Sequence, residues 1–161
     1  MNYIIILIIL LIIYIYSYYN YPKKISVLQT NPNNFKTDML LEKQPIVIEN
    51  NASPLSDMKP MFFKWNPTQS FNISGSNYWQ YNTYKYVAIQ LENSGEILLT
   101  PPNTKMLPDE DAPDPESANV LAIQAKKGEI LIIPFHWRYL INNKLDVECL
   151  GIHDYITYFL P

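Results

Sequence analysis

The sequence is poor in the residues that most often build catalytic and metal sites. Its 161 residues include one cysteine, Cys149, and two histidines, His136 and His153. A single cysteine excludes an intrachain disulfide framework and a cysteine-based zinc site, and two imidazoles leave little for metal chemistry that uses several histidines. With only 4 glycines, the chain has no glycine-rich phosphate loop of the G-x-G-x-x-G or Walker type.

The chain is also short of positive charge. It carries 12 basic and 15 acidic side chains, a net charge of −3. This balance excludes a nucleic-acid binder that works through bulk basic charge, so no nucleic-acid partner is expected. The heavy use of Ile, Asn and Tyr is typical of an AT-rich genome, such as that of a large virus or a protist.

Charge is absent altogether from the first 22 residues. The segment Tyr3–Tyr19 is almost wholly apolar and reaches the lower end of the ~17–25 residues that span a bilayer. Tyrosines crowd its C-terminal end, as in an interfacial aromatic belt. The sequence therefore predicts a transmembrane anchor at 1–22, with the membrane as a partner. The alternative, a cleaved signal peptide, lacks a basic start and a small-residue cleavage site.

The orientation of this anchor depends on few residues. The pair Lys23-Lys24 follows the apolar segment and no basic residue precedes it. The positive-inside rule then places the main domain of a single-pass protein on the cytosolic side. Asn72-Ile73-Ser74 is a glycosylation motif that argues for the opposite side.

The remaining chain divides into a linker with a short helix at 23–43 and a β-domain at 44–161. The helix is expected over Asn33–Lys43, and beyond it apolar residues alternate with a period of two, which is typical of short strands. Asn93-Ser94-Gly95 and Lys126-Lys127-Gly128 are predicted hairpin turns. Strands are predicted at Pro45–Glu49, Met61–Trp65, Tyr84–Leu91, Glu96–Thr100, Val120–Ala125, Glu129–Ile133, Arg138–Ile141, Val147–Ile152 and Tyr155–Leu160.

One segment of this β-domain has a different character. Asp109–Glu116 concentrates acidic residues and prolines, which favours a solvated loop. Its charge makes it a candidate docking site for a basic partner.

Three segments resemble the cupin-like branch of the JmjC hydroxylases, of the asparaginyl-hydroxylase type. Gln44–Ile48 resembles the opening strand of that family. Tyr86–Pro102 (YVAIQLENSGEILLTPP) resembles its central hairpin, and Gly128–Ile141 (GEILIIPFHWRYLI) its most specific motif. The resemblance implies a mainly β fold, a double-stranded β-helix that forms a cupin-like barrel with the site at its mouth.

The same resemblance implies that the catalytic residues are missing. The family holds Fe(II) with a His-x-Asp motif and a distal His, and binds 2-oxoglutarate through a Lys. The matching positions here hold Gln80, Asn82 and Tyr139 for the metal and Gly95 for the lysine. These side chains offer no negative charge to a divalent ion. We therefore expect no catalytic residue, no metal and no cofactor, and a pocket at the former metal-ligand positions.

Other side chains are expected at the rim of this pocket, namely His136, Trp137 and Tyr86. The favoured hypothesis is a membrane-anchored, non-catalytic binding or scaffold module, a pseudo-enzyme that takes a protein or a small ligand at the barrel mouth. Two alternatives stay open: an active Fe(II)/2-oxoglutarate hydroxylase with rearranged ligands, and a small structural protein of a membrane or envelope.

Overall fold

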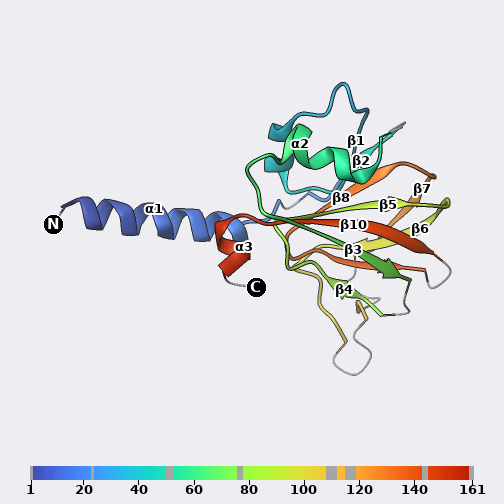
Figure 1. The fold of residues 1–161 in the computed structure, drawn as a ribbon. Helices are drawn as coiled ribbons and strands as arrows, with labels where there is room; N and C mark the ends of the chain where they lie inside the picture. The colour runs from blue at the N-terminus through green and yellow to red at the C-terminus, as the bar shows by residue number, and fades with distance from the viewer. Residues whose placement is uncertain are drawn as a thin grey trace.

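Strands dominate the part of the chain that the computed structural model describes, which comprises residues 2–22, 24–49, 53–75, 78–107, 112–114, 119–142 and 145–159. Helices lie only near the two ends and in the segment before the third strand (Figure 1). The elements in chain order are α1 (Asn2–Tyr19), β1 (Leu28–Thr30), η1 (Thr37–Glu42), β2 (Ile46–Ile48), η2 (Leu55–Asp57), α2 (Met58–Phe62), β3 (Thr68–Ser74), β4 (Gln80–Tyr81), β5 (Tyr86–Leu91), β6 (Gly95–Thr100), β7 (Leu121–Ala125), β8 (Ile130–Pro134), β9 (Arg138–Ile141), β10 (Asp146–Ile152) and α3 (Tyr155–Phe159).

The strands form two sheets. The larger has the order β1-β2-β8-β5-β10-β3 and the smaller has the order β4-β9-β6-β7. All neighbours are antiparallel except β1 and β2, which are parallel. From β3 to β10 the chain passes repeatedly from one sheet to the other, which is the winding of a cupin-like jelly roll. The predicted mainly β, cupin-like fold is confirmed at this level.

Two predicted β-hairpins, both within the described residues, are absent because of this winding. β5 and β6 flank the turn at Asn93-Ser94-Gly95, yet they lie in different sheets, and the same is true of β7 and β8 around Lys126-Lys127-Gly128. Both turns are corners at which the chain changes sheet. The antiparallel pair of consecutive strands is instead β6 with β7, in which Ile97 faces Ile123.

The space between the sheets is a packed hydrophobic core. Val87, Ile89 and Leu91 point into it from β5, and Trp137, Tyr139 and Ile141 from β9 and the corner before it. β8 has buried residues along its whole length, as a central strand covered on both faces requires. The interior of the barrel is therefore filled by side chains.

A second apolar layer covers the outer face of the larger sheet. η1, η2 and α2 lay Leu40, Leu55 and Met58 on Ile132 and Leu150 of this face. In Figure 1 these helical segments lie together on one side of the barrel. This layer gives the larger sheet a core on both faces, which explains why its central strands are apolar at successive positions.

Three predicted elements take another form. Met61–Trp65 is not a strand, because its first residues end α2, and Tyr155–Leu160 begins with α3 instead of extending the sheet. Asp154 accounts for the second change: its Oδ1 accepts a hydrogen bond from the Thr157 backbone N–H, the arrangement of a helix cap. The helix expected at Asn33–Lys43 is the shorter 3₁₀ helix η1.

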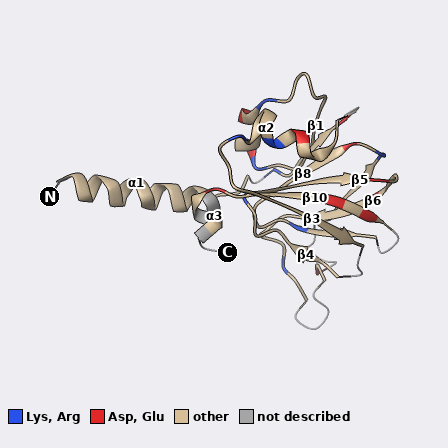
Figure 2. Cartoon of the chain, in the orientation of Figure 1, with Lys and Arg blue, Asp and Glu red and all other residues tan. Residues whose placement is uncertain are grey.

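α1 extends away from the barrel and carries no charged residue (Figures 1 and 2). Its apolar side chains from Tyr3 to Ile13 are exposed, whereas the Tyr14 hydroxyl and the Ser17 carbonyl near its C-terminal end bond to the β-domain. Its 18 residues rise about 27 Å, less than the ~30 Å of a bilayer core.

The structure of α1 corrects the prediction of a membrane anchor. Among the described residues, no helix has both the length and the apolar character that crossing a membrane requires. The predicted single-pass membrane location, with Tyr3–Tyr19 as the span, is therefore wrong.

Candidate functional site

Two of the three positions at which the resemblance predicts a former metal site are cross-strand neighbours. Gln80 of β4 lies opposite Tyr139 of β9 in the antiparallel register, so both side chains leave the same face of the smaller sheet. Asn82 follows β4 directly, and its side chain is almost fully buried. The structure therefore brings Gln80 and Tyr139 together across β4 and β9, and a shared pocket at the three positions stays a prediction.

The side chain of Asn82 is hydrogen-bonded to the backbone around it. Its Nδ2 donates to the carbonyl oxygens of Ile133, at 3.0 Å, and Pro134, at 2.8 Å. Its Oδ1 accepts from the Tyr84 N–H at 2.9 Å. The amide therefore fastens the connection between β4 and β5 to the end of β8, and its carbonyl oxygen already has a partner.

The residues present do not fit the iron of the hydroxylase family. Burial raises the pKa of Tyr139 above the usual range of a phenol, so its oxygen stays protonated at neutral pH. Gln80 and Asn82 are neutral amides, and Asn82 is already bonded. Within the described part of the chain, no group of three or more His, Cys, Asp and Glu lies close enough to share a metal ion.

Gly95, at the position of the co-substrate lysine, begins β6 opposite Ala125 of β7. A Cβ at this position would come within 2.3 Å of Leu145 Cδ1. A longer side chain here would therefore have to displace Leu145 from its contact with the core.

The predicted rim residues lie in three different surroundings. Trp137 is buried in the core, where its Nε1 has no hydrogen-bond partner among the described residues. His136 is half-buried, has a φ of 65°, and its ring stacks on Phe135 at 3.6 Å and on Tyr81 at 5.2 Å between centroids. Tyr86 packs on the outer layer of the larger sheet instead. The prediction of one pocket with these residues at its rim stays a prediction.

The acidic segment Asp109–Glu116 falls mostly outside the described residues. Of its members, the structure places residues 112–114, where Asp114 lies 3.9 Å from Lys105. The predicted docking of a basic partner on this segment stays a prediction.

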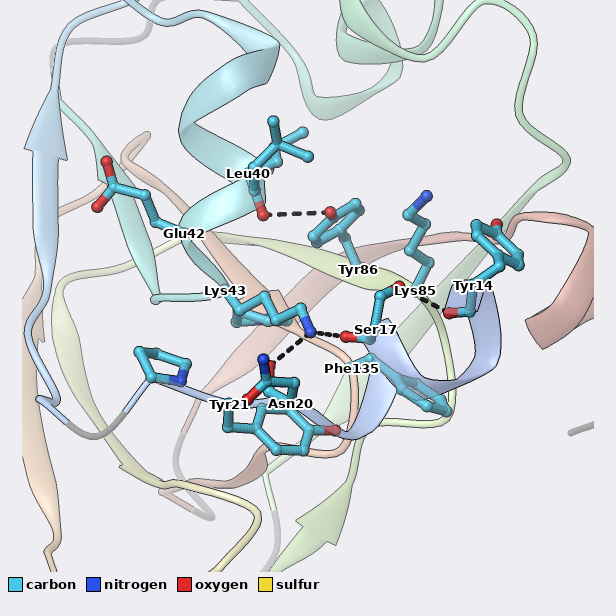
Figure 3. Close-up of a pocket in the computed structure, with 13 residues that line it drawn as sticks. Tyr14, Ser17, Asn20, Tyr21, Leu40, Glu42, Lys43, Lys85, Tyr86 and Phe135 are labelled. Carbon is cyan, nitrogen blue, oxygen red and sulfur yellow. Dashed lines mark hydrogen bonds between the residues drawn. The ribbon is translucent and has the colours of Figure 1, made fainter. Parts of the chain in front are cut away.

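A cavity of about 510 Å³ lies elsewhere, between the end of α1 and the barrel. We call it the α1 cavity (Figure 3). Four separate segments supply its wall: Tyr14, Ser17, Asn20, Tyr21 and Pro22; Leu40, Leu41, Glu42 and Lys43; Lys85 and Tyr86; and Pro134 and Phe135. It is therefore built against the ends of the central strands β5 and β8 and the segments outside the larger sheet, and none of Gln80, Asn82 and Tyr139 lines it.

Lys43 holds one wall of the α1 cavity in place. Its ammonium group donates to the carbonyl oxygens of Ser17 and, at 2.7 Å, Asn20, at the C-terminal end of α1 (Figure 3). A helix leaves its last carbonyls unpaired and carries a partial negative charge there, so a lysine is a suitable partner. Lys43 has a φ of 52° where η1 ends, and this left-handed turn directs the chain from η1 toward β2.

A second contact fixes α1 at the opposite side of the cavity. The Tyr14 hydroxyl donates to Asp154 Oδ2 at 2.8 Å, and the same oxygen lies 3.2 Å from Lys85 Nζ. The carboxylate is buried, and Thr157 satisfies its other oxygen. Burial lowers the pKa of Lys85, and burial followed by the bond to Asp154 raises that of Tyr14.

The remaining wall of the α1 cavity is mostly apolar. The Tyr86 hydroxyl donates to the Leu40 carbonyl at 3.3 Å, which ties β5 to η1, and burial raises its pKa to about 12. The ring of Tyr21 lies below Lys43, with Nζ 5.4 Å from its centroid. The cavity thus combines flat apolar surfaces with two ammonium groups.

Apart from Tyr86, which was expected at the rim of another pocket, sequence reasoning did not assign a site to these residues. The lining residues are separated by up to 121 positions, from Tyr14 to Phe135, and no motif connects them. A signal existed only in part, since Lys85 and Tyr86 adjoin a well-predicted strand. The position of α1 against them depends on tertiary contacts.

The two sheets give the chain a cupin-like fold, and α1 packs against it at the N-terminal side. No family model and no curated protein sequence matches the chain. Among solved structures it is similar to RmlC from Streptococcus suis, which was determined in complex with dTDP-D-xylose. The TM-score is 0.32 and the identity 14%, over 76% of this chain and 55% of that chain. The chain spans about half of that neighbour, and at this TM-score the likeness carries no functional argument.

Proposed function

We propose that this chain is a non-catalytic binding module on a cupin-like, double-stranded β-helix scaffold related to the 2-oxoglutarate hydroxylases, and that it binds a small molecule in the α1 cavity. The observation that carries the proposal is the cavity itself. Its volume of about 510 Å³ lies within the ~300–1,000 Å³ typical of small-molecule sites. Its apolar wall with a few polar groups also has the composition of such sites.

The loss of the family's metal chemistry supports the non-catalytic part of the proposal. The former ligand positions hold two amides and a protonated phenol, and Asn82 is used to join two corners of the barrel. The core between the sheets is filled by apolar side chains such as Ile89 and Ile97. A ligand is therefore better accommodated outside the barrel than within it.

A blocking variant tests the binding site. Ser17 lines the cavity from α1 and is exposed, so Ser17→Phe places a ring in the opening without disturbing the core. Ser17→Ala is the matched control, because it removes the same hydroxyl and leaves the cavity open. In a fragment screen by NMR on the full chain, we expect hits that shift the signals of Lys43, Lys85 and Tyr86 and that are lost in Ser17→Phe only. Hits that shift Gln80 and Tyr139 instead would contradict the site.

Iron content tests the non-catalytic assignment separately. We expect the purified chain, incubated with ferrous iron and 2-oxoglutarate, to retain no stoichiometric metal and to release no succinate. Stoichiometric iron that is lost on substitution of His136 or His153 would favour the alternative, a hydroxylase with rearranged ligands.

A further inference from the structure

The charges around the α1 cavity point to the chemistry of its ligand. Lys43 donates to two backbone carbonyls at the end of α1, whose partial negative charge offsets the full charge of the ammonium group only in part. The two ion pairs within the described residues, Lys85–Asp154 and Lys105–Asp114, do not include it. An ammonium group has three donors, and two of these are used here.

Glu42 does not supply the missing negative charge. It lines the cavity next to Lys43 in the chain, but its carboxylate points away from the Lys43 ammonium (Figure 3). The left-handed turn at Lys43 separates the two side chains. An anionic group on a ligand would therefore be the partner that Lys43 lacks.

The rest of the wall limits the ligand to one negative charge. The second ammonium, Lys85, already faces the buried carboxylate of Asp154 at 3.2 Å. A dianion would find only Lys43 without an ion-pair partner among the described lining residues. Tyr21, Leu40 and Phe135 offer flat or apolar surface to the remainder of the ligand.

We infer that the α1 cavity binds an organic monoanion with a flat apolar body, its anionic group on Lys43. This inference rests on the proposed function and adds the class of ligand. Charge-assisted hydrogen bonds are roughly twice as strong as neutral ones, which gives a carboxylate its advantage over an uncharged analogue of the same shape.

Three probes of one shape test the inference on the unaltered full chain. Isothermal titration compares naphthalene-2-carboxylate, naphthalene-2-carboxamide and 2-naphthyl phosphate. We expect the carboxylate to bind at least about tenfold more tightly than the carboxamide, and the phosphate dianion to bind no better than the carboxylate. Equal binding of carboxylate and carboxamide would overturn the inference and leave the binding function in place. Failure of all three probes would also overturn it, and the fragment screen would then decide the binding function by itself.

A variant locates the anion. In Lys43→Gln, the preference for carboxylate over carboxamide should fall to about onefold, whereas in Lys64→Gln, a lysine outside the cavity, it should not change. Because Lys43 also holds the end of α1, binding of the carboxamide to Lys43→Gln shows whether the cavity persists. If Lys43→Gln still bound the carboxylate more tightly than the carboxamide, Lys43 would not be the residue that holds the anion. If Lys43→Gln no longer bound the carboxamide, the comparison of the three probes on the unaltered chain would decide the inference.

Discussion

Tyr14 and Asp154 join the two ends of the chain. The Tyr14 hydroxyl donates to Asp154 Oδ2 at 2.8 Å, although 140 positions separate the residues in the sequence. Asp154 also caps α3 through Thr157 and pairs with Lys85 of the barrel. One buried carboxylate thus positions α1, α3 and a wall of the α1 cavity.

Removal of this hydroxyl should loosen α1. In Tyr14→Phe the ring remains and one hydrogen bond to a carboxylate is lost, which costs about 1 kcal/mol at this partly exposed position. We expect faster hydrogen exchange at the last turn of α1 and a small loss in the free energy of unfolding. Tyr16→Phe is the control, since Tyr16 is exposed on the same helix. Equal exchange in the two variants would contradict a fastening role for Tyr14.

Substitution of Asn82 should destabilise the whole barrel. Asn82→Ala leaves the carbonyls of Ile133 and Pro134 and the N–H of Tyr84 without their partner in a buried place, which costs about 2–3 kcal/mol. Asn82→Asp should cost at least as much, because a carboxylate would face two carbonyl oxygens. Urea denaturation measures both, with Asn93→Ala on an exposed turn as the control. A loss below about 0.5 kcal/mol would show that the amide does not hold the corner.

Because the thiol of Cys149 is buried, we expect the protein to lose stability at alkaline pH. It is fully buried, and burial, with a smaller contribution from Glu148, raises its pKa from 9.0 to about 12. Between these values the unfolded chain releases the thiol proton and the folded chain keeps it, so the free energy of unfolding falls as pH rises. The slope from this group is about 1.4 kcal/mol per pH unit.

The variant Cys149→Ala isolates this slope. Its stability at neutral pH should be lower because a small cavity forms, but its fall between pH 9 and 12 should be shallower than that of the unaltered chain. Denaturation curves at a series of pH values measure the difference. Parallel curves would show that the thiol does not titrate as its burial requires.

The regular, buried strands could be predicted from the sequence. The prediction Arg138–Ile141 has the bounds of β9, because it is a short apolar and aromatic run that Asn142 ends, and its burial alternates as a strand requires. β3 was missed, because Thr68, Gln69 and Ser70 are polar residues on an edge strand that is half exposed. α3 was predicted as a strand, although Asp154 three positions before Thr157 is a local signal for a helix start.

The candidate site was predictable only where it followed a local pattern. Tyr139 lies in a strand that the sequence predicts, whereas its cross-strand neighbour Gln80 lies in the two-residue strand β4, which is too short to predict from a pattern. The α1 cavity depends on the docking of α1, which rests on long-range contacts such as Lys43 with Asn20 and Tyr14 with Asp154. The long apolar run by itself favoured a membrane span, because sequence hydropathy does not show that the last turns of the helix bind the β-domain.

The most direct test of the account is a crystal of the full chain soaked with manganous chloride and naphthalene-2-carboxylate, with anomalous data collected for manganese. We expect the carboxylate in the α1 cavity with an oxygen on Lys43, and no manganese peak between Gln80, Asn82 and Tyr139. A fully occupied manganese ion at those three residues, or the carboxylate bound inside the barrel, would contradict the account.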